Sequence, residues 1–388
     1  MRRTLVWLLL VLLLLWGYER ALPSFVDRMI NRVDDHPEWV VGDKAQSLHD
    51  SIPVSDLHAD PLLWKRDWLV DEGRGHTDLP RLQAGGVALQ VLTAVTKSPS
   101  GQNYEKNSAD TDTLLYLTIA QRWPIETWSS PMARALYQAD RLSDWDARAG
   151  DAFRVIRDQE ELKALLAERA EGKRGVGGIF GIEGAHALEG NLDNLEVLDE
   201  RGLRVVGLTH FFDNQLGGSL HGESGEGLTD FGRAVVLEAD RRGMTIDIAH
   251  ASPQMVRDVI AIIDRPVILS HGGFQGVCNE GRNLDDTLMQ ELAAHGALIG
   301  VGFWDGAVCD YSPEGVVRSI QYGIDLLGVE SIALGSDFDG ATKVAFDAGE
   351  LAILTQTMID QGMSEDEIRM VMGENVIRFF QGNLPPAE

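Results

Sequence analysis

The stretch GVGGIFGIEGAHAL, residues 175–188, decides the fold that the sequence predicts. A short apolar run ends in a single carboxylate, Glu183, and a glycine lies close on each side of it, Gly181 and Gly184. Such a run is typical of a strand that is buried on both faces. Burying a carboxylate is costly unless a cation or hydrogen-bond donors meet it. The stretch therefore predicts a buried strand whose carboxyl end faces something polar.

Runs of the same kind recur along the chain and alternate with amphipathic stretches. The eight runs cover residues 52–60, 86–95, 176–184, 203–210, 244–250, 266–271, 297–304 and 332–340. Helical periodicity is found in residues 158–170, 231–243, 253–264, 285–296 and 314–328. This alternation predicts an α/β fold of parallel βα units, and eight units close a (β/α)8 barrel of the TIM type. A doubly wound open sheet is the weaker alternative, because no glycine-rich phosphate motif follows the first strand.

The chain of 388 residues starts with a segment of a different kind. Arg2 and Arg3 precede an apolar stretch from Leu5 to Trp16, which is typical of an export signal. No small-x-small cleavage motif follows, so an uncleaved signal anchor is favoured over a cleaved signal. The body is then expected on the periplasmic or extracellular side of a membrane, or secreted if cleavage occurs. The formal net charge of −26 argues against a nucleic-acid partner.

These observations give a domain layout. We expect a signal segment in residues 1–20, a connector in residues 21–50 and the barrel in residues 51–382. The segment of about 98–151 is a long insertion with its own helical stretch, residues 111–123, and is expected to pack over the barrel mouth. Two cysteines, Cys278 and Cys309, could form one bridge in an exported protein.

Polar residues fall where the predicted strands end. They are His58 and Asp60 (first strand), Glu183 (third), His210 (fourth), His250 (fifth), His271 (sixth), and Asp337 with Asp339 (eighth). A lone histidine at a strand end is usually structural, and Asp339 before Gly340 is best interpreted as a turn residue. Together, however, these residues predict one site, because all carboxyl ends of barrel strands meet at one face.

Imidazole and carboxylate ligands without thiolate suit zinc, and also manganese, iron or cobalt. The set is too large for one open catalytic zinc and fits two ions that share a bridging carboxylate. Glu183 is the natural bridge, because its strand lies between the first strand and the fifth and sixth. Gly181 and Gly184 would then leave room for ions and substrate. His186 lies past the strand end and is interpreted as a supporting or structural residue.

With these residues in place, the sequence resembles the membrane (renal) dipeptidase family, metallopeptidases with a metallo-dependent hydrolase barrel. The resemblance extends from about Val54 to Phe380. Its motifs, in order, are DLHAD, HTDLPRLQAGGVALQ, GIEGAH, GLTHFFDN, IDIAHAS, PVILSHGG, GRNLDD and GSDFDG. Each motif alone is weak, and their order and spacing together are specific.

The resemblance implies a role for each residue and two zinc ions per chain. His58 and Asp60 would bind one zinc, His250 and His271 the other, and Glu183 would bridge both. His210 would polarise the scissile carbonyl or hold the tetrahedral oxyanion. Arg282 would hold the substrate carboxylate, and Asp337 would take a proton from the bridging water and pass it to the leaving amine. Cys278 and Cys309 would form a disulfide between the loops after strands six and seven.

The implied function is zinc-dependent hydrolysis of dipeptides, including those with a C-terminal D-residue. One alternative is another binuclear amidohydrolase, such as a lactonase, deaminase or phosphotriesterase; these commonly carry His-x-His on strand one, where this chain has His58 and Asp60. The other alternative is a non-catalytic, exported peptide-binding barrel, which would be expected to lack a metal ligand. The oligomeric state stays open at this point, although members of the family are often homodimers.

Overall fold

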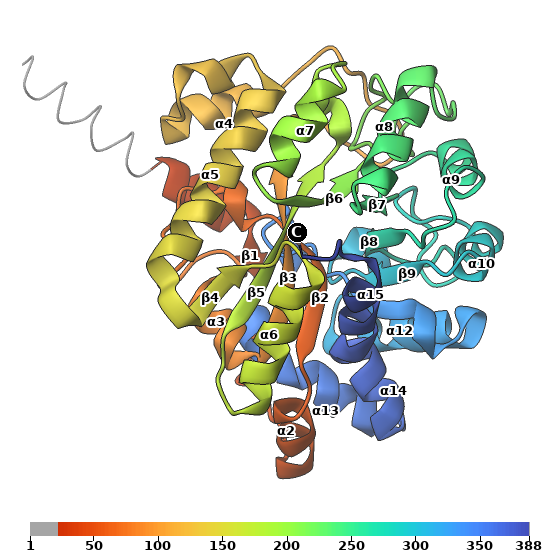
Figure 1. The fold of residues 1–388 in the computed structure, drawn as a ribbon. Helices are drawn as coiled ribbons and strands as arrows, with labels where there is room; N and C mark the ends of the chain where they lie inside the picture. Colours follow the sequence, from red (N-terminus) through yellow and green to blue (C-terminus); the bar gives the residue numbers. More distant parts are fainter. Residues whose placement is uncertain (1–21, 388) are drawn as a thin grey trace, which may run out of the picture.

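The computed structural model describes residues 22–387, which form a barrel of parallel strands surrounded by helices (Figure 1). Each of the eight predicted runs coincides with one barrel strand, and only β8 extends past its run, by one residue. These are β2 (Val54–Ala59), β3 (Val87–Val95), β5 (Val176–Glu183), β6 (Leu203–Gly207), β7 (Thr245–Asp247), β8 (Ile268–Gly272), β9 (Leu298–Val301) and β10 (Ile332–Leu334). Every neighbouring pair is parallel, β3 pairs with β5, and β10 pairs with β2, so the sheet closes on itself. The predicted (β/α)8 barrel is confirmed.

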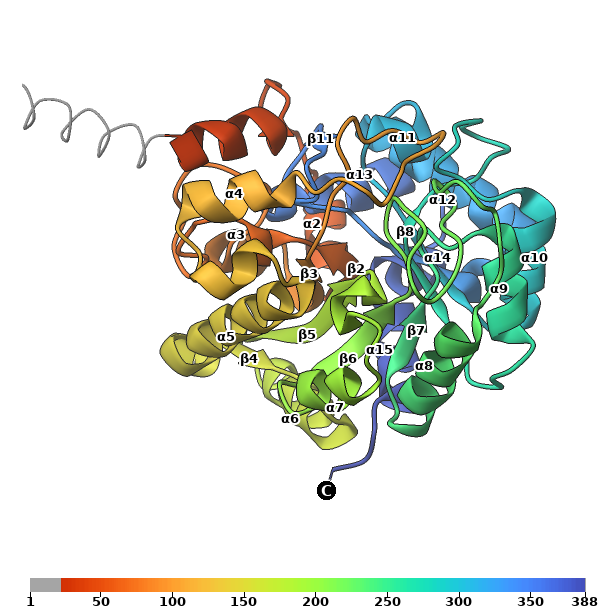
Figure 2. The same cartoon turned by 90° about the horizontal axis from the view of Figure 1, so that it is seen from above.

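Helices surround the barrel on its outer side, as the view from above shows (Figure 2). The five predicted amphipathic stretches become α6 (Gln159–Ala170), α8 (Asp230–Arg241), α9 (Pro253–Ile260), α10 (Asp286–Ala294) and α12 (Pro313–Leu327). The side chain of the residue before each helix caps it by accepting a backbone N–H. Further helices of the structure are α2 (Asp43–Asp50), α3 (Leu79–Ala84), α7 (Asp193–Asp199), α13 (Ala352–Asp360), α14 (Glu365–Arg369) and α15 (Asn375–Asn383).

The insertion between β3 and β5 holds two helices. The helix expected within residues 111–123 is α4 (Leu114–Gln121), and the longer α5 (Pro131–Ala149) follows it. The strand β4 (Phe153–Val155) ends the insertion and pairs with β5. In Figures 1 and 2, α5 runs along the outer side of β4 and β5, while α4 lies nearer the N-terminal end of the described chain.

Residues 22–30, within the predicted connector, are helical, and we refer to them as the N-terminal helix. Asp27 of this helix is buried, and its carboxylate lies 3.2 Å from Nε of both Arg66 and Arg74. Directly after the helix, Asn31 accepts the backbone N–H of Ala341 at 3.0 Å. The strand β1 (Arg32–Val33) then pairs with β11 (Lys343–Val344), so several contacts fix this helix to the barrel.

Within residues 22–387, no helix has the length and apolar composition needed to cross a membrane. The predicted signal segment, residues 1–20, lies outside the described residues.

The glycines beside Glu183 have a conformational and packing role in addition to the room that we expect them to leave for ions and substrate. Gly184 has a φ of +95°, and a Cβ there would lie 2.4 Å from Nδ1 of His186. A Cβ on Gly181 would lie 2.9 Å from the methyl group of Thr93. The backbone conformation and the packing of neighbouring side chains thus account for both glycines.

Candidate metal centre and active site

The predicted site residues gather at the carboxyl end of the barrel. Glu183 is the last residue of β5, His58 and His271 lie within β2 and β8, and Asp60 follows β2 directly. The other three lie three residues beyond a strand: His210 after β6, His250 after β7 and Asp337 after β10. All seven side chains are buried. The structure therefore places them together as the sequence predicted.

Glu183 lies at the centre of this group. Its Oε1 lies 3.2 Å from Nε2 of His250, 3.4 Å from Nε2 of His271 and 3.7 Å from Nε2 of His58. Its Oε2 lies 3.4 Å from Nε2 of His210. Four imidazole nitrogens, from the carboxyl ends of four different strands or the loops after them, therefore face a single carboxylate, which is the arrangement expected of a shared metal ligand.

Two more carboxylates approach His58. Oδ2 of Asp60 lies 3.4 Å from its Nε2, and Oδ1 of Asp337 lies 3.9 Å from it. The ligand atoms form three close groups, each within 4.8 Å: His58, Glu183 and His271; Glu183, His210 and His250; His58, Asp60 and Asp337. Because Glu183 belongs to two groups and His58 to two, neighbouring ions could share ligands here.

The hydrogen bonds behind the histidines determine which ring nitrogen faces the centre. Ser270 Oγ donates to Asp247 at 2.6 Å, which leaves its lone pairs to accept from Nδ1 of His58 at 3.2 Å and of His271 at 2.9 Å. A neutral imidazole that donates through Nδ1 has an unprotonated Nε2. When neutral, as a metal ligand must be, both rings therefore present a lone pair toward Glu183, and outer partners of this kind commonly orient metal-binding histidines.

The electrostatics of the isolated chain also favour a cation. Burial, and next the charge of Asp60, raise the pKa of Glu183 well above its ordinary value. Burial raises the pKa of Asp337 to about 8. Burial lowers the pKa of His58, but Asp60 and Glu183 outweigh it and raise the pKa to about 10. In the chain alone, burial disfavours the ionised form of these carboxylates. A divalent cation bound between them would stabilise that form.

The donor chemistry is therefore consistent with a metal site. Imidazole nitrogens and carboxylate oxygens, with no thiolate among the described residues of the cluster, are ligands of zinc and of similar divalent ions. Two members have strained backbone, since His250 has a φ of +61° and Asp337 a φ of +59°. Non-glycine residues seldom adopt this conformation, and such strain is concentrated at functional sites.

His210 is held by a contact that constrains its chemistry. Its Nδ1 lies 3.2 Å from the carbonyl oxygen of Lys97, which can only accept, so Nδ1 carries a proton. Burial lowers the pKa of His210 to about 4, which favours the neutral ring. In that form Nε2 offers a lone pair, and it donates a hydrogen bond only when the ring is doubly protonated.

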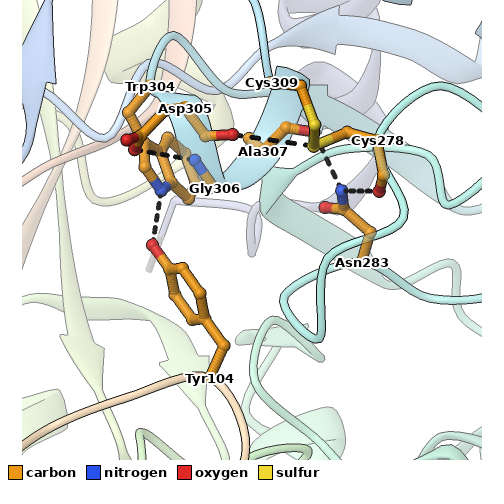
Figure 3. The surroundings of a disulfide bond; sticks show 8 residues. All are labelled: Tyr104, Cys278, Asn283, Trp304, Asp305, Gly306, Ala307 and Cys309. Carbon is orange, nitrogen blue, oxygen red and sulfur yellow. Dashed lines mark hydrogen bonds between the residues drawn. A yellow bond between two sulfur atoms is a disulfide. The ribbon is translucent and has the colours of Figure 1, made fainter.

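Arg282 borders the site from the loop that follows β8. It is buried, donates from Nη2 to the carbonyl of His271 at 2.7 Å, and lies over the ring of Trp304. Tyr104, a residue that sequence reasoning missed, accepts a hydrogen bond from Nε1 of Trp304 at 2.8 Å (Figure 3). Both Arg282 and the Tyr104 side chain border the cavity. Tyr104 comes from an irregular part of the insertion, where no periodicity marks it.

The predicted disulfide is confirmed: Cys278 and Cys309 are bonded, with Cα atoms 5.4 Å apart (Figure 3). The bond joins the loop after β8 to the end of α11 (Asp305–Val308), which follows β9. Asn283, next to Arg282, donates to the carbonyl oxygens of Cys278 and Ala307, each at 2.9 Å. The bond and these contacts hold the loop that carries Arg282.

Two other polar residues lie outside the cluster. His186 has its Nε2 2.9 Å from Oγ1 of Thr96, in agreement with a structural role. Asp339 does lie at a turn, with a φ of +64°, but the turn interpretation is incomplete. Its buried carboxylate lies 2.8 Å from Nη2 of Arg66 and accepts from the backbone N–H of His76 at 2.7 Å.

A cavity of about 450 Å³ opens onto the cluster, a size typical of small-molecule sites. Residues of the cluster and Arg282 line its floor. The rest of the lining is mainly apolar, with a few polar side chains such as Ser98, Gln102 and Thr113, and its apolar residues come chiefly from the N-terminal helix, α4 and the segments that follow β2 and β3.

Comparison with known proteins agrees with this geometry. The model of the membrane dipeptidase family, peptidase family M19, matches residues 42–383. The chain is 28% identical over 353 residues to dipeptidase aclJ of Aspergillus oryzae, covering 84% of this chain and 77% of that protein. A solved structure described as dipeptidase AC, a family M19 metallopeptidase, is 26% identical with a TM-score of 0.69, covering 86% of this chain and 99% of its own. A Rhodobacter sphaeroides metallopeptidase, solved with a phosphinate mimic of L-Ala-D-Ala, is 25% identical with a TM-score of 0.66 and the same coverage.

Proposed function

The chain belongs to the membrane dipeptidase family, a family of metallopeptidases, and from this premise we propose that it hydrolyses dipeptides with two zinc ions bound per chain. The proposal assigns His58 and Asp60 to one ion, His250 and His271 to the other, and Glu183 to both. The single observation that carries it is the buried Glu183 carboxylate, with the Nε2 atoms of four histidines around it.

When bound, the ions would supply an activated water and polarise the scissile carbonyl. Asp337, buried and next to His58, would accept a proton from the attacking water and pass it to the leaving amine. His210 would stabilise the oxyanion. Because its Nδ1 proton is engaged by Lys97, this role requires the doubly protonated ring, which a neighbouring negative charge would favour.

Arg282 would set the length of the substrate. A guanidinium binds a carboxylate with two parallel hydrogen bonds, so it would fix the C-terminal carboxylate at one distance from the cluster. A further residue beyond the scissile bond would displace that anchor, which favours dipeptides. The L-Ala-D-Ala mimic bound by the Rhodobacter relative supports acceptance of a C-terminal D-residue here as well.

A substrate panel tests the proposal. We expect the zinc-supplemented protein to hydrolyse L-Ala-D-Ala and L-Ala-L-Ala, and to leave lactones and phosphotriesters unchanged. Dipeptide turnover is measured as release of free amine, and turnover of lactones and phosphotriesters as release of acid. Hydrolysis of a lactone or a phosphotriester with no release from any dipeptide would instead favour another binuclear amidohydrolase.

Replacing Arg282 by alanine should mainly weaken substrate binding. We expect KM for L-Ala-D-Ala to rise by about 10²-fold, in the range that the loss of a buried charge-assisted contact produces. The C-terminal amide of the same dipeptide, which lacks the carboxylate, serves as the matched substrate and should be affected little. Unchanged kinetics with the free dipeptide would remove Arg282 from the substrate site.

We also propose the domain layout and location that the sequence predicts: a membrane anchor in residues 1–20, a connector in residues 21–50 and an exported barrel in residues 51–382. Exposed apolar side chains support a nearby membrane, because they gather on the N-terminal helix and α4. Phe25, Met29, Tyr116 and Ile119 are all exposed there. Such side chains commonly mark a membrane or protein contact.

A further inference from the structure

The N-terminal helix lies before the part of the chain that the family model matches, which starts at residue 42, yet it lines the cavity. Leu22, Val26 and Ile30 are the residues that it contributes at a spacing of four, together with Pro23. Residues four apart lie on one face of a helix. The helix therefore presents one continuous apolar face to the cavity.

The helix α4 supplies a second apolar wall. Leu114, Leu117 and Ala120, spaced by three, border the same cavity. Val26 and Ile30 pack, with Leu117, against one apolar cluster made of Leu63, Trp64, Val95, Leu114 and Trp123. Among the described cavity residues, none from the N-terminal helix or α4 carries a charge. Apart from Tyr116 of α4, the side chains that these two helices turn to the cavity are thus apolar, and they could receive an apolar group.

The apolar walls lie across the barrel from Arg282. Arg282 follows β8, whereas Trp64 follows β2 and α4 follows β3. Around the closed barrel, β3 and β8 are separated by the same number of strands in both directions, so they lie on opposite sides. The metal-ligand cluster lies between them. A dipeptide with its carboxylate on Arg282 would therefore extend its amino-side residue toward the apolar walls.

The N-terminal helix is also fixed in place by buried ion pairs. A part of the cavity that selects between substrates needs such a fixed position. Asp27, on the face of the helix that turns toward the barrel, is buried between Arg66 and Arg74. Arg66 in turn pairs with Asp339, two residues beyond Asp337. Removing one member of such a buried pair is costly, so the helix does not leave its position easily.

We propose that the N-terminal helix and α4 form a subsite for a large apolar side chain on the amino-side residue of the dipeptide. The proposal rests on the proposed function, because the direction of the substrate follows from Arg282. It names the preferred substrates: dipeptides that start with leucine, methionine or phenylalanine rather than glycine or alanine.

The first test compares dipeptides that share a C-terminal D-alanine. We expect kcat/KM for Leu-D-Ala and Phe-D-Ala to exceed that for Gly-D-Ala by about tenfold or more, since a few buried methylene groups give selectivity of this size. Dipeptides with the large residue on the carboxyl side, Ala-D-Leu and Ala-D-Phe, should show no such increase in kcat/KM over Ala-Gly. Equal rates for all amino-side residues, or a preference only on the carboxyl side, would overturn the subsite.

Substitutions on the two faces of the N-terminal helix give a matched comparison. Val26→Asp places a charge on the cavity face and should lower kcat/KM for Leu-D-Ala by about tenfold more than it lowers kcat/KM for Gly-D-Ala. Met29→Asp places the same charge on the exposed face, where the side chain is 63% exposed, and should change neither. Equal effects of both variants would contradict the proposal.

A second variant tests the subsite without adding a charge that could displace the N-terminal helix from the barrel. Val26→Phe fills the cavity without adding a charge, and should lower kcat/KM for Phe-D-Ala more than kcat/KM for Gly-D-Ala. Unchanged Phe-D-Ala kinetics would again overturn the subsite. If the wild-type protein with zinc hydrolysed no dipeptide at all, the proposed function would fail first, so the two failures are distinguishable.

Discussion

Replacing Glu183 by glutamine is expected to release the bound metal and to reduce dipeptide hydrolysis to background, with the fold retained. The carboxylate lies 3.2–3.7 Å from the Nε2 atoms of His58, His250 and His271. An amide has the same shape but no charge, so it cannot neutralise two cations or bridge them. Loss of the shared ligand should therefore weaken both ions together, and metal analysis with a dipeptide assay measures this.

The fold should tolerate the change for an electrostatic reason. Burial and Asp60 raise the pKa of Glu183 well above its ordinary value in the chain alone, so the ionised form is the unfavourable one without a metal. The thermal midpoint of the metal-free variant should therefore be no lower than that of the metal-free wild type. Glu189→Gln, six residues later on the exposed surface, is the matched control and should keep both metal and activity. A fully active Glu183→Gln variant would refute the bridging role.

Replacing Asp337 by asparagine should separate catalysis from metal binding. We expect both ions to remain and turnover to fall by about 10²–10⁴-fold, the range for a lost acid–base group. Asp337 is buried, and its Oδ1 lies 3.9 Å from Nε2 of His58, close enough to serve a group bound at the cluster. The measurements are kcat and metal content of the same preparation.

The outcome of this substitution also decides between two roles for Asp337, metal ligand and proton carrier. His58, Asp60 and Asp337 form one of the three close groups, so the carboxylate could itself hold an ion. Loss of metal together with activity would make Asp337 a ligand rather than the proton carrier. Unchanged turnover would exclude both roles.

The barrel and its ligand residues could be predicted from local patterns. A strand buried on both faces must be a short apolar run, so each of the eight runs was visible, as in β5. The ligands were visible because a barrel brings strand ends together: Glu183 and His271 are far apart in sequence but lie 3.4 Å apart. The chemistry was thus encoded in the alternation of apolar runs and the polar residues that end them.

Other parts depend on contacts that no local pattern reveals. The strands β1 and β11 have two residues each, and only their pairing across the fold makes them strands. The N-terminal helix lies in what reads as a polar connector, and its place beside the cavity depends on Asp27 meeting Arg66 and Arg74. Tyr104 is placed at the site by its hydrogen bond with Trp304, and no pattern in the residues around Tyr104 predicts this contact.

The metal content of the purified full-length chain tests the central claim most directly. The claim is that Glu183 joins two ion sites, one completed by His58 and Asp60 and the other by His250 and His271. Elemental analysis of the wild-type protein after zinc loading and removal of free metal should therefore give two zinc ions per chain. One ion per chain, or none, would contradict the account.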